Sequence, residues 1–120
     1  MPTASGHTQA IRAKKVIGTA VEDEDGDKIG IIEDVVLDKL SNNIMFAIVG
    51  FDGVLGMGQK YAPIPWAVLE YDEAQDAYSV PYTKDELKAA PAGSMDELTD
   101  QDGAAFRDKS FEFFEIEQYW

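Results

Sequence analysis

The sequence predicts a mainly β fold, a small antiparallel β-barrel followed by short C-terminal helices. Short runs of β-branched and aromatic residues separated by tight turns predict six strands, and this pattern is typical of a small barrel or sandwich. The length of 120 residues suits a single compact domain. We expect a flexible tail over residues 1–13, a barrel over residues 14–91, and an acidic, aromatic-rich helical extension over residues 92–120.

The expected tail is rich in Thr, Ser, Gly and Gln and contains few large apolar side chains. It includes His7, the only histidine, which we expect to be solvated. The tail has no apolar run that could serve as a signal peptide. The longest apolar stretch, Ile44 to Phe51, is far shorter than the roughly 20 residues of a transmembrane helix. We therefore expect a cytoplasmic protein.

Two strands are expected at the start of the barrel. Val16 to Val21 is a short β-branched run, and the Asp25-Gly26 pair after it favours a tight hairpin turn. The second strand, Ile29 to Leu37, alternates apolar and polar residues. One of its faces is expected to carry Ile29, Ile31, Val35 and Leu37.

The third strand, Ile44 to Phe51, is apolar on both faces. A barrel strand needs only one apolar face, so Met45, Val49 and Phe51 would contact water unless something covers them. The C-terminal segment and a second subunit are the two candidates for this cover. Three further strands are expected at Tyr61 to Ile64, Ala67 to Tyr71 and Ala77 to Tyr82.

Two helix starts follow the barrel strands. Thr83 with Glu86 three residues later forms a capping box, which predicts a short helix over Thr83 to Ala89. Ser94 with Glu97 is a second capping box of the same kind.

The C-terminal segment is too apolar to remain solvated. Phe106, Phe113, Ile116 and Trp120 would form one apolar stripe on a helix. Burying a Phe side chain is worth roughly 2–3 kcal/mol, so we expect this helix to dock on its own barrel or on an identical subunit. The candidate interface residues are Phe106, Phe113, Phe114, Ile116, Tyr119 and Trp120.

Composition argues against several kinds of function. The net charge of −13 opposes direct binding to nucleic acid and to anionic membranes. The absence of Cys excludes thiolate chemistry, and a single His cannot form a multi-His metal site or a Ser-His-Asp triad. Adjacent carboxylates such as Glu33 and Asp34 are unavoidable among 23 acidic residues. We expect no catalytic residue, no cofactor and no metal.

Two segments resemble ligand-binding loops but do not match them. The acidic run Glu22 to Asp27 would need an acid at Val21 and a Glu at Ile32 to form an EF-hand loop, so we expect a solvated hairpin tip. The run Gly53 to Lys60 fits no phosphate-binding glycine motif and is expected to be a tight loop between strands.

Three segments, in order, resemble the PRC-barrel family. Val16 to Asp38 is similar to its opening hairpin, with Ile17-Gly18, Asp25-Gly26, Lys28-Ile29-Gly30 and Glu33-Asp34-Val35-Val36 at the corresponding places. Gly53 to Trp66 resembles its glycine loop and Pro–Trp step, and Val80 to Pro91 its closing strand and helix. The family includes the cytoplasmic domain of the photosynthetic reaction-centre H subunit and the C-terminal domain of a ribosome maturation factor. The resemblance implies a small β-barrel that binds protein partners and has no catalytic residues to transfer.

The leading hypothesis is a non-catalytic protein-binding or scaffolding module that self-associates as a homodimer. One alternative is a ribosome-assembly or RNA-processing accessory that acts through a basic ribosomal protein, since an acidic surface attracts basic partners. Another is a module that binds a small molecule or a cation.

Overall fold

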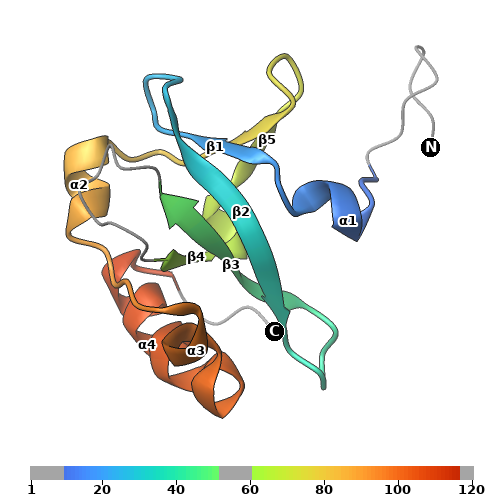
Figure 1. Cartoon of the computed structure of the whole chain (residues 1–120), viewed down its shortest axis with the longest axis vertical. Coiled ribbons are helices and arrows are strands. Elements are labelled where there is room, and N and C mark those ends of the chain that lie inside the picture. Colours follow the sequence, from blue (N-terminus) through green and yellow to red (C-terminus); the bar gives the residue numbers. More distant parts are fainter. Residues whose placement is uncertain (1–9, 52–60, 117–120) are drawn as a thin grey trace.

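A computed structural model describes residues 10–51 and 61–116 of the chain. Six strands form one sheet in the order β4-β3-β2-β1-β6-β5. The predicted loop over Gly53 to Lys60 and the first nine residues of the predicted tail lie outside the described residues. The strands are β1 (Ala20–Glu22), β2 (Lys28–Leu37), β3 (Ile44–Phe51), β4 (Tyr61–Pro65), β5 (Glu70–Asp72) and β6 (Ala77–Ser79) (Figure 1).

The sheet is rolled, although its two edges are not paired. β4 and β5 lie at opposite edges, yet only four residues join them, three of which form a 3-10 helix (Trp66–Val68). That link spans at most about 18 Å, whereas the edges of a flat six-stranded sheet would be about 24 Å apart. The short link therefore requires the sheet to curl.

The prediction of a closed antiparallel barrel is wrong in two respects. Over the described ranges, β4 and β5 share no ladder, and β1 pairs with β6 in parallel. The edge of β4 is bonded instead by the chain after the barrel, because Tyr61 and Gly93 exchange two backbone hydrogen bonds of 2.9 Å. The outer backbone groups of Tyr61 are therefore already bonded and cannot also pair with β5.

The concave side of the sheet holds the inner core. Its largest fully buried members come from β1 to β4, from the residue that follows β6, and from the helix Lys84–Lys88. They include Val21, Ile29, Ile32, Val49, Ile64, Val80 and Leu87, and Trp66 packs against them. On β2 the inward residues are Ile32 and Val35 rather than the predicted Ile31 and Val35, while Leu37 is exposed. Two irregularities each add one residue to β2 and shift the alternation of its side chains. One lies at Ile29 in the pairing with β1, and the other lies between Ile32 and Asp34 in the pairing with β3.

The opposite side of β3 is covered by the C-terminal helices of the same chain. α3 (Met95–Thr99) and α4 (Ala104–Phe113) lie against β3 and β4 (Figure 1). Met45, Phe46 and Ile48 of β3 and Leu98 of α3 form a second buried group, the outer cluster. The need for a cover was therefore predicted correctly. The face was wrong for Val49 and Phe51, which belong to the inner core.

The local helix signals are confirmed, and two strand predictions need correction. Thr83 and Ser94 both close capping boxes, at the starts of α2 (Lys84–Lys88) and α3. The run Val16 to Val21 is not one strand, because α1 (Ala13–Val16) ends there and β1 begins only at Ala20. The run Ala67 to Tyr71 is divided between the 3-10 helix and β5. No helix of the described residues is long and apolar enough to cross a membrane.

The β1–β2 turn forms where the sequence predicts it, but it is not fully solvated. Gly26 has φ +84°, which suits a glycine. The Asp23 carboxylate accepts the backbone N–H groups of Asp25 and Asp27 at 2.9 and 3.0 Å. Glu22 and Asp23 are 8% and 4% exposed, so two of the acids expected at a solvated tip are buried.

Gly30 tests the close approach of β2 to β3. A Cβ atom at this position would lie 2.3 Å from the carbonyl oxygen of Gly50. We expect Gly30→Ala to lower the free energy of unfolding by about 1–3 kcal/mol, because the two strands would have to move apart. Urea unfolding measures the effect, and a midpoint equal to that of the wild type would contradict the observed strand spacing.

Candidate interaction surface

The start of α4 is fixed by a glycine against β3. Gly103 precedes the helix with φ +84°, a left-handed conformation that other residues adopt at a cost of about 1–2 kcal/mol. A Cβ atom at Gly103 would also lie 3.2 Å from Cζ of Phe46 and 3.3 Å from Cγ1 of Val36. The chain can enter α4 this close to the outer face of β3 because no side chain intervenes.

One buried hydrogen bond and one aromatic side chain hold α4 on the sheet. The hydroxyl of Ser110, a fully buried residue, donates to the carbonyl oxygen of Pro63 in β4. Phe106 packs against the outer cluster, and the Lys109 ammonium lies 4.9 Å from the centre of its ring. Such a cation–π contact with the face of a ring is worth about 0.5–1 kcal/mol at an exposed site.

The helix ends at Phe113, earlier than the apolar stripe predicts. The N–H of Ile116 donates to the carbonyl of Phe111 at 2.9 Å, and that of Glu115 donates to the carbonyl of Glu112 at 3.3 Å. Glu115 has φ +56°, so the segment is a Schellman ending with a left-handed residue after the helix. Ile116 therefore lies outside the helix that carries Phe106 and Phe113, and the prediction of one continuous stripe is wrong over the described residues. Trp120 lies outside those residues.

Three rings gather where α4 ends, and we call Tyr82, Phe113 and Phe114 the aromatic cluster. The ring centres of Tyr82 and Phe114 are 5.2 Å apart, and those of Phe113 and Phe114 are 4.9 Å apart with an edge-on angle of 83°. Phe114 is buried in the inner core, and Ile116 packs against the same core. Phe113 is 37% exposed, so the cluster has one edge in solvent.

The candidate interface residues therefore divide into groups. Phe106, Phe114 and Ile116 make contacts within the chain. Phe113 presents an exposed ring. Tyr119 and Trp120 lie outside the described residues.

Burial and charge act together on the hydroxyl of Tyr82. Burial raises the pKa of Tyr82 above its usual value, and the nearby carboxylates of Glu115 and Glu86 raise it further. The neutral phenol is therefore the form that the aromatic cluster favours.

The part of the chain that carries the six strands matches a known protein family. A family model described as PRC-barrel domain matches residues 9–87, more than half of the chain. The chain belongs to the PRC-barrel family. No curated protein matches it in sequence. The PRC-barrel match ends within α2, so α3, α4 and the candidate interface residues lie beyond it.

A second feature of the PRC barrel was not predicted from the sequence. Glu22, Asp23, Glu24, Glu70 and Asp72 line one pocket of about 310 Å³. Pairing of β1 with β6 places Glu22 opposite Ser79, and pairing of β6 with β5 places Ser79 opposite Glu70. The acidic run from Glu22 was visible in the sequence, but its neighbour across the sheet is set by a parallel pairing that the expected hairpins did not include.

Ser110 tests the docking of α4 on β4. We expect Ser110→Ala to lower the free energy of unfolding by about 1 kcal/mol, because the Pro63 carbonyl loses a buried donor. Glu112→Ala, an exposed change on the same helix, is the control and should stay within about 0.5 kcal/mol of the wild type. Equal effects of the two substitutions in urea unfolding would contradict the buried hydrogen bond.

Tyr82 gives a pH test of the aromatic cluster. Because its pKa is raised by folding, its contribution is complete below the unfolded value of about 10 and is lost as the pH rises through the folded value. We expect Tyr82→Phe, which keeps the ring beside Phe114, to lose less stability than the wild type between pH 9 and about 11. Urea midpoints across this range measure the difference, and parallel curves would count against a raised pKa of the partly buried Tyr82.

Proposed function

We propose that the chain is a non-catalytic PRC-barrel module that binds protein and associates with a second copy of itself through the solvent edge of the aromatic cluster. The observation that carries this proposal is the exposed ring of Phe113, which is packed edge-on against the buried Phe114. A ring already fixed by a neighbour loses little conformational entropy on binding. Rigid aromatic side chains of this kind are frequent at the centres of protein interfaces.

Charge supports an apolar contact between copies. Two chains of net charge −13 repel each other, and polar contacts between like surfaces would add to that repulsion. An uncharged ring contributes no such repulsion and gains from leaving water. Salt shortens the range of the repulsion to about 8 Å at 0.15 M, so association through Phe113 should become tighter as salt rises.

A non-catalytic role is supported by the residue types that are present. The chain has no Cys and a single histidine, His7, so common nucleophile–base pairs cannot be assembled from it. Membership of the PRC-barrel family also supports a binding role. The resemblance to this family implies a module that binds protein partners and has no catalytic residues to transfer.

The structure limits how the interface can be tested. Residues 92–116 include α3 and α4, which cover Phe46 and Ile48, so their removal would expose buried surface and change the fold itself. The test therefore requires changes that leave α3 and α4 in place. Phe113→Ala removes the exposed ring, and a chain ending at Ile116 removes Tyr119 and Trp120.

Light scattering coupled to size exclusion measures the oligomeric state of these variants. We expect the full chain to be a dimer, and we expect Phe113→Ala to raise the dimer dissociation constant by about tenfold or more, the effect of losing an interface anchor. Leu40→Ala is the matched control, because Leu40 is 96% exposed in the β2–β3 turn and lies away from the aromatic cluster. It should leave the dimer unchanged.

Two outcomes would contradict the proposal. One is a full chain that remains monomeric at the highest concentration and at high salt. The other is a dimer that both Phe113→Ala and the chain ending at Ile116 leave as tight as in the wild type.

A further inference from the structure

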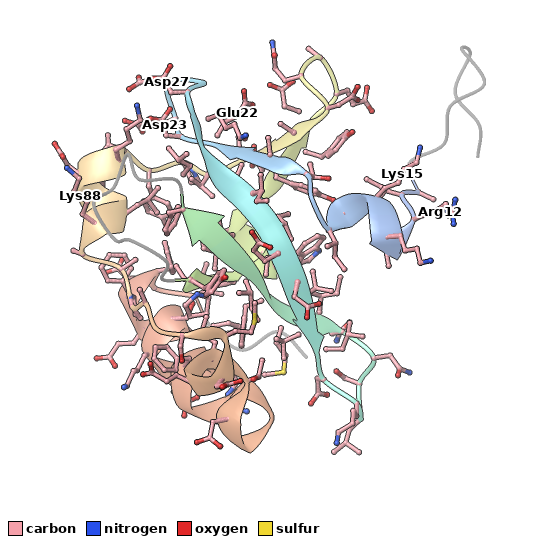
Figure 2. All side chains as sticks on the ribbon, viewed as in Figure 1. Arg12, Lys15, Glu22, Asp23, Asp27 and Lys88 are labelled. Carbon is pink, nitrogen blue, oxygen red and sulfur yellow. The ribbon has the colours of Figure 1, made fainter. Side chains whose placement is uncertain are left out.

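The acidic pocket lies at one end of the sheet, between two hairpins. Its walls come from β1 and the turn after it, from β5, and from the end of β6. Its lining comprises Glu22, Asp23, Glu24, Gly26, Glu70, Asp72, Ser79, Val80 and Pro81, around about 310 Å³. Figure 2 shows Glu22 between the β1–β2 hairpin and the β5–β6 hairpin. This volume is at the lower end of the range for small-ligand sites.

Strand register explains why carboxylates meet on this face. Directly paired residues project to the same side of a sheet, so Glu22, Ser79 and Glu70 form one row across β1, β6 and β5. The alternate row holds Val21, Tyr78 and Tyr71. The ring centres of the two tyrosines in that row are 5.1 Å apart. One face of these strands is therefore apolar, and the other concentrates negative charge.

Glu22 is the unusual member of this row. The residue is 8% exposed, and none of the described residues forms a hydrogen bond or an ion pair with its carboxylate. Its neighbour Asp23 is equally buried but accepts two backbone N–H groups in the turn. No buried side-chain oxygen among the described residues lacks a partner, so the Glu22 carboxylate itself reaches the solvent in the pocket. Its stem is buried and its oxygens are free to accept a donor from outside the chain.

The nearby lysines do not neutralise this pocket. Lys84 pairs with Asp27 at 3.5 Å, and Lys88 pairs with Asp85 on α2 at 3.5 Å. Lys28 is opposite Glu22 in the β1–β2 register, but it is exposed and forms no ion pair with it. None of these three lysines lines the pocket.

The arrangement suits an organic cation better than a bare metal ion. A divalent ion needs several oxygens within about 2.0–2.6 Å of one point. Among the described residues no group of three acidic or His side chains is arranged in that way. A guanidinium or ammonium group carries several N–H donors on its outside and can reach carboxylates that are farther apart. Val80 and Pro81 offer an apolar wall for the carbon stem of such a group.

We propose that this pocket binds a guanidinium or primary-ammonium group, with Glu22 as the inner anion, whose stem is buried, and Glu70 as the exposed anion. The group can belong to a free amine or to an Arg or Lys side chain on another polypeptide. None of the three residues of the aromatic cluster lines this pocket, so cation binding and self-association are tested independently of each other.

Isothermal titration of the full chain tests this site with four probes. These are arginine methyl ester, spermidine, the capped peptide acetyl-Gly-Arg-Gly-amide and calcium chloride. We expect Glu22→Gln to weaken amine or peptide binding by about tenfold, because a neutral amide replaces a charge-assisted acceptor of the same size. Glu112→Gln is the matched control, since it makes the same change of charge on the exposed side of α4 and should leave binding unchanged.

The outcomes separate the sources of the cation. Binding of arginine methyl ester or spermidine with loss in Glu22→Gln supports a free amine, whereas binding of the peptide alone with the same loss supports a polypeptide side chain. If Glu22→Gln does not fold, Glu70→Gln provides the same comparison at an exposed position. The proposal is overturned by binding of calcium alone, by no binding of any probe, or by equal binding to the Glu22→Gln and Glu112→Gln proteins.

Discussion

The contact of α3 and α4 with the outer face of β3 is the constraint on which the rest of this PRC barrel depends. β3 is buried on both sides: Val49 and Phe51 join the inner core, while Phe46 and Ile48 join the outer cluster. The inner core alone would leave Phe46 and Ile48 in water, at roughly 2–3 kcal/mol for each large side chain. The helices remove that cost, so the acidic extension is a structural part of the molecule rather than an appendage.

The same contact determines where an aromatic surface can form. α4 begins at Gly103 over Phe46 and is tied to β4 through Ser110, and it ends beside Tyr82 of the segment that follows β6. Phe114 enters the inner core there, and Phe113 keeps one edge in solvent because the helix stops at that residue. A docking geometry fixed inside the chain thus leaves a small apolar surface on an otherwise strongly acidic protein.

Local signals in the sequence predicted local structure well. The capping boxes at Thr83 and Ser94 and the turn at Asp25-Gly26 depend on residues within a few positions of each other, and each is present. The two apolar faces of β3 predicted a cover because that argument needs only burial. Which face of β3 points into the inner core could not be predicted, because both faces are apolar and either could be the inward one.

Features set by long-range pairing could not be predicted in this way. The parallel pairing of β1 with β6 brings Glu22 beside Ser79, and neither sequence run carries a signal for the other. The bonding of the β4 edge depends on Gly93, more than thirty residues after Tyr61. The early end of α4 is local, but it uses a left-handed Glu115 where a glycine is usual, so the sequence carries no signal for it. The acidic pocket follows from the long-range pairing, and the exposed edge of Phe113 follows from the early end of α4.

Native-state hydrogen exchange tests most directly whether α4 and the sheet form one unit. If the helices are an integral cover, the amides of Ser110 and Phe114 in and after α4 should exchange only through the same large opening as those of Ile48 and Val49 in β3. Their free energies of opening should then agree and fall together as denaturant is added. Fast exchange of the α4 amides while β3 stays protected would contradict the account, because it would show that the sheet is stable without its helical cover.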